Sequence, residues 1–382
     1  MEQKESSGIA EKILSPFARF LDRGGKSVIG IDVGASSIKV VQVRKKAGKA
    51  VLETYGEIAL GPYANLAVGQ ATRLKQDKIR EALDDLLREA NVTSRSGGFA
   101  VPLRSSFVTV IEVMNVSEKE LKEVVEIEAR KYIPMPIREV TLDWNPLPLL
   151  DENGEVFDEH DGRKSHAKTR QVLIAAIHNE AISAFSSLAQ SAKLSISFLE
   201  IEVFSLIRSL LHRERAPVLL VDMGAGSTKL AVVEGGVARR THTIDRGSQD
   251  MTIALSRSQG LSIVKAEERK REIGLSKDPK YKDTADSLRF AMRDIFAQAN
   301  KLLLQYEKQY NRTISKVVLS GGGSLVKGVV EMASNNFSAE VVYADPFSRV
   351  ETPAFLDPTL KSIGPNFSVS LGVALRKLEE EG

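Results

Sequence analysis

The sequence IDVGASSIKV at residues 31–40 returns as VDMGAGSTKL at residues 221–230. The two copies align without a gap at an offset of 190 positions (222 minus 32), and Asp, Gly, Ala, Ser and Lys occupy the same places in both. Each copy follows an apolar run and leads into another, which predicts a strand, a tight glycine turn and a second strand. The repeated element is therefore expected to be a β-hairpin and not a strand-to-helix turn.

The residue types in these turns suit an anion. Small residues let backbone N–H groups approach a phosphate closely, and the Ser and Thr hydroxyls add donors. The Asp before each turn would repel a phosphate unless a hard cation such as Mg²⁺ lay between them. A single copy is explained equally well by an ordinary turn, but two matched copies argue against coincidence. Two facing hairpins would clamp a metal-bound polyphosphate from both sides.

Two other nucleotide-binding motifs fail in their details. The second copy contains a G-x-G, but Lys229 stands where the dinucleotide fingerprint needs its third Gly, and a strand follows in place of a helix. Residues 25–27 read Gly-Lys-Ser, like the end of a P-loop, yet the first Gly of that motif would fall at Phe20. Neither motif is retained.

Composition places the chain among ordinary globular proteins. It has 382 residues, of which 42% are hydrophobic and 27% charged, which is enough for two or more domains. Lys plus Arg exceeds Asp plus Glu by only three (53 minus 50), so no nucleic acid is expected as a partner. The absence of Cys excludes disulfides, thiolate zinc sites and Cys nucleophiles. With no apolar run near ~20 residues and no secretory signal, a cytoplasmic protein is expected.

Residues 1–26 predict an amphipathic N-terminal segment that ends at a flexible joint. Its apolar side chains recur at helical spacing on one face, at Ile9, Ile13, Leu14, Phe17, Phe20 and Leu21. Such a helix could contact a membrane surface through residues 9–21 or dock on a partner. A tail that packs on its own domain, or stays disordered, explains the pattern equally well.

After residue 27 the pattern alternates strands and helices, which predicts an α/β protein. Strands are expected at 28–33, 38–43, 50–60 and 97–101, with a helix at 76–90. A second module, 99–198, is expected to run strand, helix, strand, strand, helix, strand, with a polar loop at 151–170. The second half mirrors the first and adds a helix at 245–260 and a long helix at 284–311.

A glycine-rich loop follows the strand that ends at Ser320. Gly321, Gly322 and Gly323 precede a predicted helix, so a flat ring could rest on bare backbone beside a helix N-terminus. Such a loop alone is weak evidence. After two phosphate hairpins it completes a nucleotide site.

Together these residues resemble the superfamily of actin, the heat-shock chaperones and the sugar kinases, which bind a nucleotide between two related α/β domains of the ribonuclease H-like type. The resemblance implies ATP and Mg²⁺ as cofactors, with Asp32 and Asp222 reaching the Mg²⁺ directly or through water. It implies a first phosphate site of Asp32, Gly34, Ser36, Ser37 and Lys39, a second of Asp222, Gly224, Gly226, Ser227 and Thr228, and an adenosine site of Gly321, Gly322 and Gly323. Glu267 and Lys270 match the A-E-x-x-K phrase with which bacterial actins reach ribose and adenine.

Within the superfamily, the insert resembles subdomain 1C of FtsA-like proteins. The stretch EARKYIPMPI at 128–137 is similar to the E-A-x-x-Y-[IL]-P-[FM] region of the PilM family, the actin-like proteins of type IV pilus assembly. The implied division is 1–26 as the amphipathic segment, 27–98 with 199–215 and 365–382 as subdomain 1A, 99–198 as subdomain 1C (SHS2-like), 216–248 with 312–364 as subdomain 2A, and 249–311 as subdomain 2B.

The PilM resemblance implies a cytoplasmic ATP-binding scaffold, peripheral at the inner face of the cytoplasmic membrane. It would hold the N-terminal cytoplasmic peptide of PilN and contact other inner-membrane and motor components of the pilus machine, with self-association left open. The strand at 107–114 and the helix near Tyr132 are the candidates for the peptide groove.

Catalysis and two alternative functions remain open at this stage. Residues 201–205 are similar to the L-E-P-x-A phrase of bacterial actins, so Glu202 is the candidate that positions the attacking water, although Val203 replaces the family Pro. We expect slow turnover at most. An FtsA-like division protein that polymerises at the membrane is one alternative, although an acidic C-terminus (residues 379–381) would be repelled by anionic lipid. A small-molecule kinase is the other, although nothing marks a sugar site.

Overall fold

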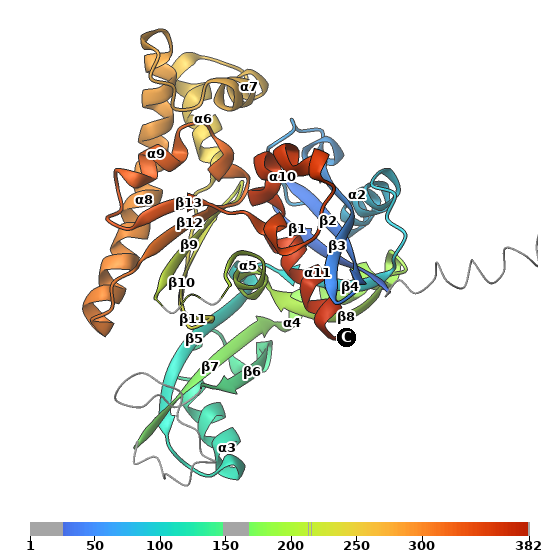
Figure 1. The fold of residues 1–382 in the computed structure, drawn as a ribbon, viewed down its shortest axis with the longest axis vertical. Helices are drawn as coiled ribbons and strands as arrows, with labels where there is room; N and C mark the ends of the chain where they lie inside the picture. Colours follow the sequence, from blue (N-terminus) through green and yellow to red (C-terminus); the bar gives the residue numbers. More distant parts are fainter. Residues whose placement is uncertain (1–25, 148–167, 213, 215, 381–382) are drawn as a thin grey trace, which may run out of the picture.

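The computed structural model describes residues 26–147, 168–212, 214 and 216–380 of the chain. The predicted N-terminal segment lies outside these residues apart from its last position, and so do residues 151–167 of the predicted polar loop. Two β-sheets with their helices make up the described part, and a smaller lobe projects from the second sheet (Figure 1). The predicted division into subdomains stays a prediction.

The first sheet has the strand order β3-β2-β1-β4-β8. Its strands are β1 (Ser27–Val33), β2 (Ser37–Lys46), β3 (Lys49–Ala59), β4 (Ser96–Val101) and β8 (Ser195–Ile201). The first three form the expected antiparallel meander, and β4 and β8 run parallel to β1. Successive side chains of a strand point to opposite faces. Accordingly, Ile29 and Ile31 pack with α2 (Gln76–Glu89), whereas Val28 packs with α11 (Ser368–Glu380).

The second sheet has the order β13-β12-β9-β10-β11-β5-β7-β6. Its strands are β9 (Val218–Met223), β10 (Thr228–Glu234), β11 (Val237–Ile244), β12 (Lys316–Ser320), β13 (Glu340–Tyr343), β5 (Ser106–Met114), β6 (Val140–Pro146) and β7 (Thr169–His178). Its helices are α6 (Ser248–Gln259), α7 (Ile263–Ile273), α8 (Lys282–Tyr310) and α9 (Val329–Ser334). Helix α10 (Asp357–Ile363) packs instead in the core of the first sheet, where Leu360 is buried.

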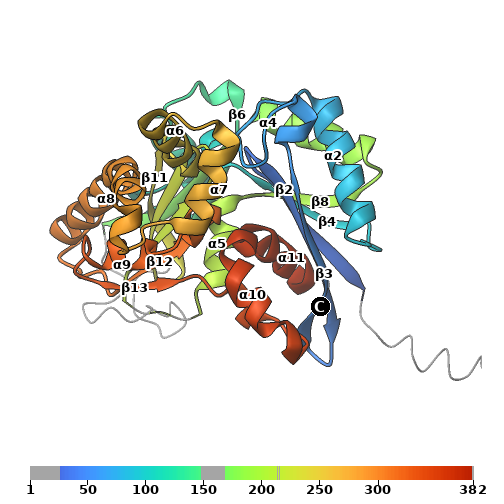
Figure 2. The same ribbon diagram turned by 90° about the horizontal axis from the view of Figure 1, so that it is seen from above.

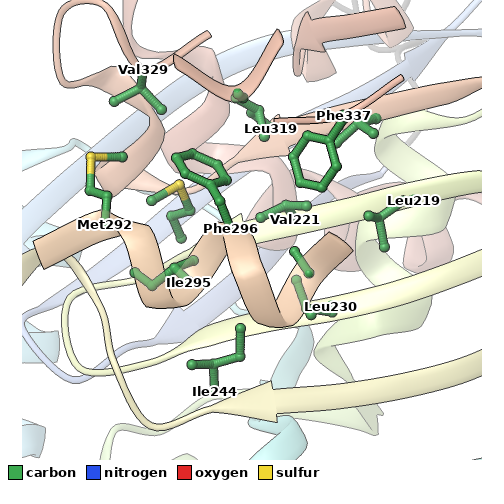
Figure 3. Close-up of a cluster of buried hydrophobic side chains, with 14 of the residues drawn as sticks. Leu219, Val221, Leu230, Ile244, Met292, Ile295, Phe296, Leu319, Val329 and Phe337 are labelled. Atoms are coloured by element: carbon green, nitrogen blue, oxygen red, sulfur yellow. The ribbon is translucent and has the colours of Figure 1, made fainter. Parts of the chain in front are cut away.

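The apolar stripe of α8 forms the core of this half (Figure 3). Met292, Ile295 and Phe296 are fully buried against strand residues that include Val221 and Leu230. Each such side chain contributes about 1.5–3 kcal/mol when it leaves water. The second hairpin is thereby fixed on the long helix, which positions its turn at the end of the sheet.

A helix pair lies between the two sheets (Figure 2). Helix α5 (Glu202–Leu210) packs against β9, β10 and β11 on one side and against α11 on the other. At their crossing, a Cβ on Gly372 would come within 2.0 Å of the Ser205 carbonyl oxygen, so only glycine permits this approach. Because α5 follows β8 directly, the chain that leaves the insert leads through β8 into this helix pair.

The projecting lobe contains β5, β6, β7 and α3 (Glu118–Ala129), which share one small core. Strand β5 pairs with β7 along its length and joins β11 at Thr109 opposite Arg240, so the lobe continues the second sheet. The last helix and strand assigned to the insert lie elsewhere. Helix α4 (Asn179–Ser191) packs into the core of the first sheet, where Leu188 and Ala189 are buried, and β8 is the outer strand of that sheet.

Candidate functional site

A cleft of about 870 Å³ opens between the two sheets, and both hairpins line it. Fourteen of the predicted residues form its wall, namely Asp32, Gly34, Ser36, Ser37, Lys39, Glu202, Asp222, Gly224, Gly226, Ser227, Glu267, Lys270, Gly321 and Gly322. The two halves of the sequence repeat therefore meet at one cavity.

The two hairpin turns have the same backbone hydrogen bond and face each other. The Gly34 N–H donates to the Ser37 carbonyl at 2.9 Å, and the Gly224 N–H donates to the Ser227 carbonyl at 3.0 Å. A Cβ on Gly226 would lie 3.6 Å from the Cβ of Ala35, so a side chain on the second turn would reach the first. Larger residues at these positions would fill the space that an anion between the turns requires.

The glycine loop is fitted onto the second hairpin. Gly321 has φ of +79°, and a Cβ there would lie 2.6 Å from the Met223 carbonyl oxygen and 2.7 Å from Oδ1 of Asp222. Any side chain would clash with the hairpin and strain the backbone. The loop continues into a 3₁₀ helix, Gly322–Leu325, so that bare backbone forms the adjoining wall of the cleft.

Lys39 of the first hairpin points to its own sheet. Its Nζ donates to Ser37 Oγ at 2.9 Å and lies 3.6 Å from Oε1 of Glu57 on β3. The other oxygen of Glu57 accepts from Asn366 at 2.6 Å. Although burial raises the pKa of Glu57, Lys39 and the surrounding hydrogen bonds outweigh it and hold this pKa below its usual value. The cation here is already partly neutralised at the edge of the cleft.

Lys229 of the second hairpin points into a cluster of carboxylates. Its Nζ lies 3.1 Å from Asp222 Oδ2 and 3.1 Å from Glu202 Oε2. The second oxygen of Glu202 accepts from the Leu103 N–H at 2.7 Å, just before β5 begins. Burial raises the pKa of Glu202, and the negative charges of Asp222 and Asp32 raise it further, against the lowering effect of Lys229. Both oxygens of the predicted catalytic carboxylate are therefore engaged.

Asp32 completes the acidic side of the cleft. Burial raises its pKa above the usual value, while Lys39 and Lys229 act in the opposite direction. Within the described ranges, no group of three or more His, Asp or Glu side chains is arranged to hold a metal ion by itself. Mg²⁺ normally binds through one or two carboxylates together with substrate phosphates and water. The residues fit a metal ion that enters with a polyphosphate and meets Asp32.

Helix α7 supplies a charged pair at the other end of the cleft. Glu267 Oε2 lies 2.6 Å from Lys270 Nζ and accepts from Thr252 Oγ1 at 2.6 Å, while Oε1 accepts from Arg271 at 2.7 Å. Burial raises the pKa of Glu267, but these partners outweigh it and lower the pKa overall. The two residues predicted to reach ribose and adenine thus lie together.

Two predicted residues do not line the cleft. Thr228 is fully buried, and its hydroxyl donates to the Arg246 carbonyl at 2.9 Å. It is the neighbour of Lys229 on β10, so the alternation of the strand turns it to the opposite face. Gly323 is also buried, and a Cβ there would lie 2.9 Å from the Met223 carbonyl oxygen. Both residues support the site from behind.

Several cleft residues escaped the sequence analysis. Lys229, Glu57 and Asn366 line the cleft, but only the repeat alignment hinted at the first of them. A strap formed by residues 69–73 also crosses from the first sheet to the second half. The Thr72 N–H donates to the Ala35 carbonyl at 2.8 Å, and the Ala71 N–H donates to Gln249 Oε1 at 2.6 Å. No apolar period or glycine motif marks this strap.

The fold is shared with solved structures of bacterial actin-like proteins. The ethanolamine utilization protein EutJ from Carboxydothermus hydrogenoformans is 14% identical, with a TM-score of 0.54 over 92% of this chain and 90% of that one. MreB5 of Spiroplasma citri, bound to ADP, is 13% identical, with a TM-score of 0.53 over 93% and 97%. The fold is therefore actin-like, with two α/β domains around a cleft, and the predicted fold class is confirmed.

A more specific similarity covers nearly the whole chain. A PilM–PilN type IV pilus biogenesis complex contains a chain that is 25% identical, with a TM-score of 0.75 over 92% of this chain and 98% of that one. The family model of the type IV pilus assembly protein PilM matches residues 30–378. The chain belongs to this PilM family, as the resemblance of the insert predicted. Among the described residues, no helix has both the length and the apolar character needed to cross a membrane.

Proposed function

We propose that the cleft binds ATP, with the phosphates between the two hairpin turns and the adenosine on the backbone of Gly321 and Gly322. The facing turns carry this proposal, since each is closed by the same glycine hydrogen bond and Gly226 leaves open the space beside Ala35 that a side chain would occupy. The Glu267–Lys270 pair lies where a ribose or base would need polar contacts. The MreB5 structure bound to ADP supports a nucleotide in a cleft of this fold.

Mg²⁺ would enter with the nucleotide and neutralise phosphate charge. Asp32 is the carboxylate that would meet it, and Lys39 would contact the phosphates from the first turn. The catalytic role of Glu202 stays a prediction, because its oxygens bind Lys229 and the Leu103 N–H in this state. We expect ATP to act mainly as a conformational ligand.

Calorimetry with Mg·ATP tests the site. Asp32→Ala should weaken binding at least a hundredfold, and Lys39→Met at least tenfold because a charge-assisted contact of about 1.5–3 kcal/mol is lost. Asp286→Ala is the matched control, since Asp286 lies half exposed on α8 and pairs only with Arg289. If both cleft variants bind Mg·ATP as tightly as wild type, the proposal that the two hairpins hold the phosphates is wrong.

We propose further that the chain is an assembly scaffold whose partner is the N-terminal cytoplasmic peptide of PilN. Membership of the PilM family and the similarity to a PilM–PilN complex support this partner and disfavour the division-protein and kinase alternatives. Strand β5 pairs with β7 along its length but with β11 only at Thr109, and β6 is an edge strand, so the sheet offers two places where a peptide could pair. The lobe also exposes three large apolar side chains, Met114, Ile127 and Tyr132.

Point substitutions test this better than removal of 99–198, because that range contains α4 and the first half of β8, which belong to the first sheet. A Met114→Ser/Ile127→Ser/Tyr132→Ser variant should bind a labelled PilN peptide at least tenfold more weakly in fluorescence anisotropy. The control is Phe290→Ser/Phe355→Ser, which removes two large apolar side chains outside the lobe that are even more exposed. Equal loss in both variants would exclude the lobe as the specific surface.

We propose a location at the inner face of the cytoplasmic membrane. The part of the chain predicted to contact lipid, residues 9–21, lies outside the described residues, so support comes from its sequence alone. Removal of residues 1–24 should reduce flotation with liposomes that contain anionic lipid. Unchanged flotation would show that the segment does not bind the membrane.

A further inference from the structure

Lys229 places one ammonium group among carboxylates that come from separate elements. Its Nζ lies 3.1 Å from Asp222 on β9 and 3.1 Å from Glu202 at the start of α5. Its third electrostatic neighbour is Asp32 on β1 of the other sheet. The exposed fractions of the side chains are 19% for Lys229, 8% for Asp222 and 5% for Glu202. One cation therefore serves three carboxylates, and the two that it contacts directly are largely withdrawn from water.

One oxygen of Asp222 is bound by Lys229 in this arrangement. Lys229 Nζ lies 3.1 Å from Oδ2, while Oδ1 faces Gly321, where a Cβ would lie 2.7 Å from it. The sequence analysis assigns Asp222 to Mg²⁺, together with Asp32. A divalent cation and an ammonium group compete for such oxygens because both are attracted by the same paired negative charge.

We propose that Lys229 is a tethered counter-ion, whose ammonium group occupies the position between Asp222 and Glu202 that a divalent cation would otherwise take in the nucleotide-free protein. The pair is neutralised without a metal ion, and a metal ion enters only with the nucleotide, at Asp32. Loss of the ammonium group opens a divalent-cation site. The proposal deepens the ATP-binding function and, for its effect on the nucleotide, rests on it.

The first hairpin contains a built-in control for this idea. Lys39 stands at the equivalent position of the repeat, but its Nζ bonds Ser37 and lies near Glu57, whose side chain is 37% exposed. Removal of Lys39 leaves Glu57, which water and Asn366 can still solvate, while Asp32 keeps the neighbouring charge of Lys229. A new cation site is therefore expected only when the second lysine is removed.

Titration of the full-length protein with MnCl₂ alone tests the proposal. Binding is followed by calorimetry and by the electron paramagnetic resonance signal of free Mn²⁺. Lys229→Met should bind one Mn²⁺ at least tenfold more tightly than wild type or Lys39→Met, and Asp222→Asn added to Lys229→Met should abolish the gain. The proposal is overturned if wild type binds Mn²⁺ as tightly as Lys229→Met, or if the gain survives Asp222→Asn.

A second measurement covers a variant that folds poorly. Thermal unfolding with and without Mn²⁺ should show a rise of the midpoint for Lys229→Met and none for wild type or Lys39→Met. If Lys229→Met does not fold in either condition, Lys229→Gln, which removes the positive charge but keeps a polar side chain beside both carboxylates, is titrated in the same way. Failure of Lys229→Gln to bind Mn²⁺ more tightly than wild type contradicts the proposal.

Titration with ATP in the presence of a chelator separates the proposal from the nucleotide function. Removal of Mg²⁺ should weaken ATP binding more strongly in Lys229→Met than in wild type, by at least a further tenfold. If removal of Mg²⁺ weakens ATP binding equally in both proteins, the result contradicts the role of Lys229 as a counter-ion. If wild type binds no ATP under any condition, the nucleotide function fails, whereas the titration with Mn²⁺ alone still decides the role of Lys229.

Discussion

The two phosphate hairpins have nearly the same sequence and turn geometry, yet their lysines have different partners. In each, the Lys stands directly opposite the Asp across the hairpin, Lys39 opposite Asp32 and Lys229 opposite Asp222. The residue opposite each lysine on the following strand determines which further partner the lysine has. Lys39 also stands opposite Glu57 of β3, while Lys229 stands opposite Thr243 of β11, which carries no charge.

This difference keeps the contacts of Lys39 within its own sheet, whereas the contacts of Lys229 join separate elements. Lys229 turns to its own Asp222 and to Glu202, which in turn accepts from the Leu103 N–H before the insert. The second hairpin is thus coupled to α5 and to the chain that leads into β5. A repeated motif acquires a distinct role through one neighbouring residue that the repeat does not include.

The largest expected effect is the loss of each lysine. Lys229→Met should lower the free energy of unfolding by about 3–5 kcal/mol, because it leaves two buried carboxylates without their cation. Lys39→Met should lower the free energy of unfolding by about 1 kcal/mol or less, since Glu57 is still solvated by water and hydrogen-bonded by Asn366. Urea denaturation of both variants checks the difference. Equal losses would show that the two hairpins are alike in energy as well as in sequence.

The glycine loop gives the next effect. Gly321→Ala should lower the free energy of unfolding by about 3 kcal/mol, because it combines a left-handed backbone with a clash against Met223 and Asp222 of the second hairpin. Gly236→Ala has φ of +77° but open space around its Cβ, so it should cost only about 1 kcal/mol. Thermal or urea unfolding of the two variants separates the cost of the left-handed backbone from the cost of the clash. A similar cost for both would mean that the loop can withdraw from the hairpin.

The carboxylates beside the two hairpins should respond to pH in opposite directions. Glu57 has a lowered pKa, so its contribution to stability is present above its usual pKa of 4.5 and is lost as the pH falls through the folded-state value. Glu202 has a raised pKa, so its contribution is present below 4.5 and is lost as the pH rises through the folded-state value.

Unfolding curves of wild type, Glu57→Gln and Glu202→Gln between pH 3.5 and 7 would measure this, with ~1.4 kcal/mol for each unit of pKa shift at the buried Glu202. The advantage of wild type over Glu57→Gln should shrink toward acid, and that over Glu202→Gln should shrink toward neutral pH. The same trend in both pairs would contradict the assigned environments.

The smallest expected effect comes from Gly→Ala substitutions in the two hairpin turns, which test whether the turns are equally tight. A Cβ at Gly34 would lie 3.1 Å from the Ser37 carbonyl oxygen, and one at Gly224 would lie 3.0 Å from the Ser227 carbonyl oxygen. Each Gly→Ala variant should lose about 0.5–1 kcal/mol, because the carbonyl must shift slightly. Differential scanning calorimetry should place the two variants within about 0.5 kcal/mol of each other. A clear difference would reveal strain in one turn only.

The sequence predicted the elements well where the signal is local. The hairpins, α2 and α8 emerge within a few residues of their expected bounds, since each shows its own apolar period. Thr228 and Gly323 do not line the cleft, because the family motif does not say which face a residue takes. Helix α4 and strand β8 follow the insert in chain order but pack in the first sheet, where β8 pairs with β4, and chain order alone does not specify such neighbours.

The sequence by itself determined the duplicated hairpin, the glycine loop and the family to which the chain belongs, because residue type and spacing encode turns, apolar faces and motifs directly. Only the tertiary structure decided that Lys39 meets Glu57 and that Lys229 meets Glu202, or that Asn366 reaches Glu57 from 309 positions away. Charge interactions depend on distance and burial in space, which sequence separation does not measure. The roles of the two lysines therefore come from their neighbours across the fold.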